Sequence, residues 1–139
     1  MKTYKLLLLL CIATLISCKE NNLGAQKKQV AQKGVIEIIA LTDFKSKIEQ
    51  ETVQLIDVRT PGEYIEGRIS YAKNINFYDS DFLNQLEKLD KNKPVYLYCK
   101  SGGRSGKASK RLLDAGFNLV YDLKGGFSGW ERAGLPIKK

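Results

Sequence analysis

The strongest constraint on the fold is the alternation of short apolar segments with helical patterns between residues 35 and 139. Residues 94–99, PVYLYC, are almost continuously apolar, which is typical of a strand buried on both faces at the centre of a parallel sheet. Four more strands are expected, at 35–39, 53–57, 72–77 and 118–123. The alternation predicts an α/β domain with a central, mostly parallel, five-stranded sheet and helices on both faces.

The segments between these strands carry helix signals. Helices are expected at 42–50, 60–67, 80–92, 103–116 and 125–134. Thr42 or Asp43 is suited to cap the first helix, and Pro61 fits the first turn of the second. Gly116 is suited to end the fourth. The expected apolar faces comprise Phe82, Leu83, Leu86 and Leu89 in the third helix, and Ala108, Leu112 and Leu113 in the fourth.

The N-terminus has the layout of an export signal. Lys2 and Lys5 precede an apolar run at 6–16, which is too short to span a bilayer and fits the core of a signal peptide. Residues 15–18, LISC, resemble the lipobox of bacterial lipoproteins, in which cleavage precedes a cysteine that is acylated. The alternative is a buried N-terminal helix with an incidental cysteine.

The lipobox resemblance implies a signal peptide at 1–17, followed by a lipidated Cys18. Residues 18–34 are polar and lack apolar periodicity, which is typical of a flexible tether. The globular domain is then expected at 35–139. The protein would be exported and lipid-anchored to a bacterial membrane, with the domain facing the periplasm or the cell exterior.

The charge balance gives no support for a nucleic-acid partner. The chain has 23 Lys and Arg against 15 Asp and Glu, a formal net charge of +8. Without residues 1–17 the charge would be +6, because that segment holds two lysines and no acidic residue. This suits a small anionic substrate or an anionic membrane surface, although basic side chains on exposed helices are often simply solvated. No basic stripe is interleaved with aromatic residues, so we expect no nucleic-acid partner.

The chain has three cysteines and no histidine. Cys11 would be removed with the signal peptide and Cys18 would carry the lipid, so Cys99 would be the single free thiol of the mature chain. The lack of histidine excludes a Cys-His dyad, a Ser-His-Asp triad and a His-ligated zinc site. We expect neither a metal nor a cofactor.

Cys99 stands where a strand ends and a glycine-rich, basic loop begins, CKSGGRSGK at 99–107. Backbone N–H groups of this loop can turn inward and hold an anion, and the following helix adds its positive N-terminal end. The glycines that permit such a turn are Gly102, Gly103 and Gly106, and the nearby positive charges are Lys100, Arg104 and Lys107. The pattern predicts a lowered pKa for Cys99. The alternative is a buried structural cysteine, which predicts apolar neighbours instead.

Four segments in order resemble rhodanese-type sulfurtransferases, over about 35–139. CKSGGRS at 99–105 resembles that family's active-site loop, Cys-x-x-Gly-x-Arg-Ser or Thr. The other segments are LIDVRTPGEYIEGRI at 55–69, AKNINF at 72–77 and LKGGFSGWERAGLPI at 123–137. The resemblance implies one rhodanese-like domain.

The resemblance also implies a reaction and a set of site residues. Cys99 would take a sulfane sulfur from a small anionic donor such as thiosulfate, carry it as a persulfide, and pass it to a thiol or to cyanide. This is the activity of a thiosulfate sulfurtransferase. The residues implied to bind the donor are Lys100, Ser101, Gly102, Gly103, Arg104 and Ser105. Those implied to support the loop are Asp57, Arg59 and Glu63.

Several alternatives remain open at this point. Arg104 either binds the anionic end of the donor or pairs with an acid, for which Glu63 is the candidate by analogy with the family. Trp130 is either a core residue or a platform for substrate. A non-catalytic module that binds a persulfide or a partner is the main alternative function. A phosphatase is less favoured, because related phosphatase loops place five residues between cysteine and arginine, whereas here four separate Cys99 from Arg104.

Overall fold

The computed structural model of the protein describes residues 34–50 and 52–139. The expected signal peptide, the lipidated Cys18 and the tether up to residue 33 lie outside the described residues. Within the described ranges, no helix is both long enough and apolar enough to cross a membrane.

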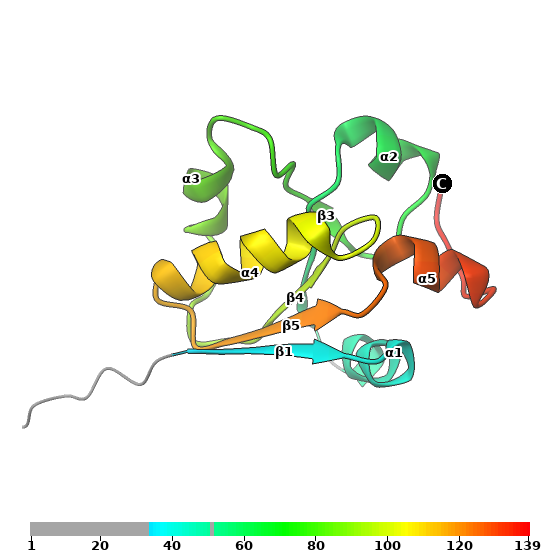
Figure 1. Cartoon of the computed structure of the whole chain (residues 1–139), viewed down its shortest axis with the longest axis horizontal. Coiled ribbons are helices and arrows are strands. Elements are labelled where there is room, and N and C mark those ends of the chain that lie inside the picture. The colour runs from blue at the N-terminus through cyan, green and yellow to red at the C-terminus, as the bar shows by residue number, and fades with distance from the viewer. Residues whose placement is uncertain (1–33, 51) are drawn as a thin grey trace, which may run out of the picture. The chain divides into compact units, whose positions relative to one another are not determined.

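Strands and helices alternate along the described chain (Figure 1). The strands are β1 (Val35–Ile39), β2 (Gln54–Asp57), β3 (Lys73–Asn74), β4 (Val95–Tyr98) and β5 (Leu119–Leu123). The helices are α1 (Leu41–Gln50), α2 (Pro61–Glu66), α3 (Phe82–Leu86), α4 (Gly103–Asp114) and α5 (Gly126–Arg132).

The five strands form one sheet in the order β1-β5-β4-β2-β3, and every strand pair is parallel. The expected α/β domain with a five-stranded sheet is therefore confirmed, and the sheet is entirely rather than mostly parallel. Strand β4 lies at its centre, between β5 and β2. This position accounts for the continuous apolar sequence of β4, because a central parallel strand meets packing partners on both faces.

Two buried clusters cover the two faces of the sheet. Along β4, Val95 and Leu97 belong to one cluster, whereas Tyr96 and Tyr98 belong to the other, as the period of two requires. The helix residues in the first cluster are Phe82 and Leu86 of α3 and Ala108 and Leu112 of α4. Those in the second are Phe44 of α1 and Phe127 and Trp130 of α5. The expectation of helices on both faces is confirmed.

The third helix differs most from the sequence expectation. A helix was expected at 80–92, but α3 covers only five residues and its N-cap, Asp81, makes no side-chain cap hydrogen bond. Phe82 and Leu86, four residues apart, are buried, and Leu89 packs against the same cluster from a turn beyond the helix. Leu83 is 48% exposed, so its placement on the buried face was wrong. A helix of barely more than one turn presents only its i and i+4 positions to the core.

The ends of α2 and α4 agree with the sequence prediction, whereas the predicted cap of α1 was wrong. Helix α1 begins at Leu41, so neither Thr42 nor Asp43 precedes it as a cap. Helix α2 begins at Pro61 and has a capping box, in which the Thr60 side chain accepts from the Glu63 backbone N–H and the Glu63 carboxylate accepts from the Thr60 N–H. Helix α4 ends as expected before Gly116, whose φ is +90°.

The parallel arrangement brings the candidate site residues to one edge of the sheet. Asp57 is the last residue of β2 and lies beside Tyr98, the last residue of β4, in the strand register. Cys99 follows directly. Ligand sites of open parallel sheets lie outside the carboxyl ends of the strands, and this is where both residues stand.

The contrast between Leu112 and Leu83 gives a test of the packing. Leu112 is 0% exposed between α4 and the sheet, so Leu112→Ala should lower the free energy of unfolding by about 2–5 kcal/mol. Leu83→Ala, the matched control, should change it by less than about 0.5 kcal/mol. Urea denaturation of the two variants and the unmodified chain measures both values, and equal losses would contradict the assignment of the two faces.

Candidate active site

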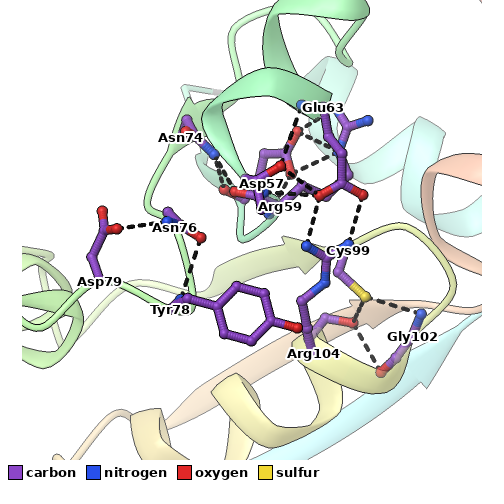
Figure 2. A network of polar contacts seen from close by, with 12 residues as sticks. Asp57, Arg59, Glu63, Asn74, Asn76, Tyr78, Asp79, Cys99, Gly102 and Arg104 are labelled. Atoms are coloured by element: carbon purple, nitrogen blue, oxygen red, sulfur yellow. Dashed lines mark hydrogen bonds and ion pairs between the residues drawn. The ribbon is translucent and has the colours of Figure 1, made fainter.

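The sulfur of Cys99 is surrounded by hydrogen-bond donors of its own loop (Figure 2). The backbone N–H of Gly102 donates to Sγ at 3.1 Å, and the hydroxyl of Ser105 lies 3.5 Å from Sγ. Ser105 is the third residue of α4, so the loop closes around the sulfur from the strand end to the first helical turn. The arrangement can hold a negative charge at Sγ or on an atom bound to it.

The turn depends on one glycine rather than on three. Gly102 has φ +112°, a left-handed conformation that residues with a Cβ rarely adopt. Gly103 and Gly106 lie within α4, and neither has a positive φ. The expectation that all three glycines supply unusual φ values was therefore wrong for two of them, because the helix starts immediately after the turn.

The start of α5 fixes the backbone of the loop. Phe127 N donates to the carbonyl of Cys99 at 2.8 Å, and Ser128 N donates to the carbonyl of Lys100 at 3.0 Å. Gly126 permits this approach, because a Cβ there would lie 2.5 Å from the Cys99 carbonyl oxygen and its φ is +57°. Sequence reasoning gave Gly126 no role, although two adjacent glycines before a helix were a visible signal.

Cys99 is buried. In this respect it resembles the alternative of a buried structural cysteine more than the polar residues of its loop suggested. The residue is 1% exposed and belongs to the same apolar cluster as Val58, Leu97 and Ala108. Its Cβ points to the α4 face of the sheet, as Leu97 does two residues earlier. The polar loop nevertheless reaches Sγ, so the sulfur is not enclosed by apolar groups alone.

The pKa of Cys99 is lowered from its ordinary value. Burial is the largest influence and opposes ionisation, but it is outweighed by hydrogen bonds from the Ser105 hydroxyl and from the backbone N–H groups of Ser105, Gly102 and Ser101. The lowered pKa of Cys99 that the sequence predicts is therefore found. Its main cause is the hydrogen bonds of the loop rather than the charges of Lys100, Arg104 and Lys107.

Arg104 pairs with Glu63 of α2. Nη1 and Nη2 of the guanidinium each lie 2.7 Å from a different carboxylate oxygen, a two-point contact, and Figure 2 shows the pair beside Cys99. The side chains are 17% and 22% exposed. The hydrogen bond from Arg104, with further ones from Thr60, outweighs partial burial and lowers the pKa of Glu63 to about 2. Of the two alternatives left open for Arg104, the ion pair is the one observed.

Asp57 and Arg59 form a second ion pair near the loop. Arg59 Nη2 lies 2.6 Å from Asp57 Oδ2, and it also donates to the carbonyl of Gly67 at 2.7 Å. The guanidinium carbon lies 3.9 Å from the centre of the Phe127 ring. Because Phe127 N donates to the Cys99 carbonyl, the ring contact links this ion pair to the backbone of the loop, and neither side chain hydrogen-bonds to Sγ. Support of the loop by Asp57 and Arg59 stays a prediction.

Most of the remaining residues singled out in the sequence do not contact the sulfur. Lys100, Ser101 and Gly103 are exposed at the rim of the loop, and of these only Ser101 acts on Sγ, through its backbone N–H. Trp130 is 3% exposed, and its Nε1 donates to the carbonyl of Pro136 at 2.9 Å, so it is a core residue. A cavity of about 740 Å³ lies against Trp130, Val53 and Tyr71 but has no residue of the Cys99 loop in its lining. It is separate from the candidate site.

One buried acid near the site was missed. Asp122 of β5 is 3% exposed and lies close enough to Ser105 for that side chain to oppose the rise in its pKa that burial causes. Nothing in the sequence marked it beyond an acid in an otherwise apolar strand, LVYDL. Its proximity to Ser105 arises only because β5 lies next to β4 and below α4.

Comparison with known proteins identifies relatives. Residues 40–133 match the family described as "Rhodanese-like domain". A protein named "Sulfurtransferase" from Allochromatium vinosum is 36% identical over 89 residues, covering 64% of this chain and 81% of the relative. "Thiosulfate sulfurtransferase GlpE" from Actinobacillus pleuropneumoniae is 35% identical over 91 residues, covering 66% of this chain and 82% of the relative.

A solved structure shares the fold. The crystal structure of a rhodanese-like domain protein from Staphylococcus aureus superimposes with a TM-score of 0.63 and 33% identity. The match covers 74% of this chain and 99% of that one. Sequence and backbone comparisons therefore point to the same family.

The Glu63–Arg104 pair predicts a pH-dependent contribution to stability. Because the pKa of Glu63 is about 2 when folded and about 4.5 ordinarily, the contribution is present above pH 4.5 and is lost as the pH falls towards 2. Glu63→Gln should cost about 1–3 kcal/mol at pH 6, since one pKa unit corresponds to about 1.4 kcal/mol and the pair is partly screened by solvent.

Urea denaturation at pH 6 and at pH 2.5 measures this difference. The gap between Glu63→Gln and the unmodified chain should shrink markedly at the lower pH. Glu66→Gln, a change at an exposed residue of the same helix, should show little effect at either pH. A gap that stays constant between the two pH values would contradict the assignment.

Proposed function

The chain belongs to the rhodanese-like family, and from this we propose that it is a sulfurtransferase in which Cys99 carries a sulfane sulfur as a persulfide. The donor is a small anion such as thiosulfate, and the acceptor is a thiol or cyanide. Relatives named sulfurtransferase support this class of reaction. The observation that carries the proposal is the set of donors around Cys99 Sγ, which favours the thiolate and can also hold a charged second sulfur.

The reaction has two displacement steps. The Cys99 thiolate attacks the outer sulfur of thiosulfate, the S–S bond of the donor breaks, and sulfite leaves with the bonding electron pair. The acceptor thiolate then attacks the outer sulfur of the persulfide, and Cys99 leaves as a thiolate. No proton is transferred in either step when both thiols are ionised, so the lack of histidine is no obstacle.

The positive potential at the sulfur comes mainly from the backbone. Gly102 N donates to Sγ, and helix α4 begins at Gly103, so its N-terminal end faces the loop. Arg104 is neutralised by Glu63, which leaves the backbone donors to hold the charge of the persulfide. Access is narrow, because Cys99 is 1% exposed, and this favours a slender donor that ends in a single sulfur atom.

The alternative functions receive less support. A non-catalytic module needs no ionised thiol, yet the hydrogen bonds to Sγ lower the pKa of Cys99 despite its burial. A phosphatase needs its arginine to bind the phosphate, whereas Arg104 makes a two-point contact with Glu63. The loop is also one residue shorter than in related phosphatases.

Cys99→Ser gives the direct test of the reaction. After exposure to thiosulfate, the unmodified chain should gain the mass of one sulfur atom at Cys99, and cyanide should remove it, because cyanide attacks the outer sulfur. Cys99→Ser should show no added mass and only background transfer to cyanide. Site-resolved mass spectrometry and a thiocyanate assay measure the two effects. Equal transfer by both proteins would refute Cys99 as the carrier.

We also propose that the chain is exported and anchored to a bacterial membrane through lipid on Cys18. The proposal rests on the sequence, in which a basic start, an apolar run at 6–16 and LISC at 15–18 follow in order. A diacylated cysteine binds a membrane stably, since each buried CH₂ contributes about 0.8 kcal/mol. The domain then faces the periplasm or the cell exterior.

Cysteine substitutions near the N-terminus test the anchor. In a bacterial host, the unmodified chain should incorporate labelled palmitate and sediment with membranes. Cys18→Ala should abolish the label, because the acylated thiol is gone. Cys11→Ala is the matched control and should leave the label unchanged, since Cys11 lies in the segment that would be removed. Label retained in Cys18→Ala would contradict the proposal.

A further inference from the structure

Asp122 is a buried carboxyl group that the proposed reaction does not use. It is the fourth residue of β5 and is 3% exposed, on the face of the sheet covered by α4. Its register neighbours are Leu97 of β4 and Ile38 of β1, which are both apolar. Among the described residues, Oδ1 of Asp122 is a buried side-chain oxygen without a hydrogen-bond partner. Burial of such a group is costly, so its position calls for a reason beyond packing.

The Ser105 hydroxyl joins Asp122 to the sulfur of Cys99. Ser105 is 0% exposed, and its Oγ lies 3.5 Å from Cys99 Sγ and 3.2 Å from the Gly102 carbonyl oxygen. The Asp122 carboxyl group lies against the first turn of α4, since a Cβ at Gly106 would be 3.8 Å from its Oδ2. Burial raises the pKa of Asp122 and hydrogen bonding with the Ser105 side chain opposes that rise, so the carboxyl group lies within reach of the same hydroxyl. A hydroxyl carries one hydrogen, so Ser105 can donate to only one of these acceptors at a time. The sulfur and the carboxyl group therefore compete for the same hydrogen.

We propose that Asp122 is a positioning residue that controls, through the Ser105 hydroxyl, how readily Cys99 is ionised. Neutral Asp122 donates its own proton to Ser105 Oγ, which leaves the Ser105 hydrogen for Sγ. Ionised Asp122 accepts the Ser105 hydrogen instead, so Sγ loses that hydrogen bond. The inference rests on the proposed role of Cys99 as the nucleophile.

The titration behaviour of the two groups agrees with this arrangement. Burial raises the pKa of Asp122 to about 6, although the hydrogen bond with Ser105 opposes the shift. The pKa of Cys99 is lowered. The Ser105 side chain acts on both groups, because its hydrogen bonding helps to lower the pKa of Cys99 and opposes the rise in the pKa of Asp122.

Charged side chains of the surrounding elements are directed elsewhere. On α4, Arg104 pairs with Glu63, Arg111 stacks on Phe77 and Phe82, and Lys107 and Lys110 are exposed.

On the opposite face of the sheet, Lys47 of α1 lies over the Tyr121 ring, and Glu131 and Arg132 of α5 are exposed. Glu37 of β1 is exposed as well. The titratable group that faces Asp122 through Ser105 is Cys99.

The sign of the effect follows from the charge. Below pH 6 Asp122 is neutral and leaves the Ser105 hydrogen to the thiolate, whereas above pH 6 the carboxylate takes that hydrogen and the thiolate is less favoured. Asp122→Asn keeps the shape and the ability to donate to Ser105 but removes the charge. In this variant Cys99 should ionise at lower pH, and its titration should follow a single-proton curve rather than a coupled one.

The rate of Cys99 alkylation by iodoacetamide, followed between pH 5 and 10, tests the inference. The full chain is used, and site-resolved mass spectrometry separates Cys99 from the other cysteines. At pH 7, Asp122→Asn should react roughly threefold to tenfold faster than the unmodified chain, the range expected for the net contribution of one hydrogen bond. Ser105→Ala should react slower by a similar factor. In the Ser105→Ala background, Asp122→Asn should change the rate by less than about twofold.

Two results would overturn the inference. One is an alkylation profile of folded Asp122→Asn that matches the unmodified chain. The other is an equal gain from Asp122→Asn with and without Ser105, which would mean that the charge acts without the hydroxyl. Thermal melting followed by circular dichroism verifies that each variant is folded. Because alkylation needs no sulfur donor, these results are independent of whether Cys99 forms a persulfide.

A measurement on the unmodified chain avoids substitution altogether. The ¹³C shift of the Asp122 carboxyl carbon should titrate near pH 6, and its midpoint should move after Cys99 is alkylated, because the competing acceptor has then lost its charge. A midpoint near the ordinary value of about 4, unchanged by alkylation, would refute the proposed coupling.

Discussion

Two backbone hydrogen bonds, from Phe127 N and Ser128 N to the carbonyls of Cys99 and Lys100, hold the loop that surrounds the sulfur. They turn these carbonyl oxygens towards α5 and thereby leave the N–H side of the loop facing Sγ. This contact requires the absence of a side chain at Gly126, where a Cβ would lie 2.5 Å from the Cys99 carbonyl oxygen. The last helix of the domain thus determines the geometry around a residue almost 30 positions earlier in the chain.

The electrostatics of the site depend on which charges are already paired. Arg104 and Glu63 neutralise each other at the rim, and Asp57 and Arg59 form a buried pair nearby. Backbone dipoles are therefore the main source of positive potential at Sγ, and unlike lysine side chains they are fixed by the fold. Asp122 differs from these paired groups, because its carboxylate has no basic partner among the described residues. It is linked to the site only through Ser105.

Sequence reasoning succeeded where local pattern and tertiary environment agree. The continuous apolar run of β4, the start of α2 at Pro61 and the stop at Gly116 each have a local physical cause, and each is found. It failed where packing decides the outcome. Leu83 fits the apolar pattern of a longer helix, yet α3 is short and leaves it exposed. Gly103 and Gly106 were expected to permit unusual φ values, yet both lie in the helix predicted at 103–116 and neither has a positive φ.

The sequence by itself determined the fold class, the place of Cys99 at a strand end, and the residue types of its loop, because periodicity and glycine content are local properties of the chain. Only the tertiary structure decided that Cys99 is buried, that Glu63 neutralises Arg104, and that Asp122 lies behind Ser105. These contacts join residues from different strands and helices. Their proximity follows from the strand order β1-β5-β4-β2-β3, which no local pattern encodes.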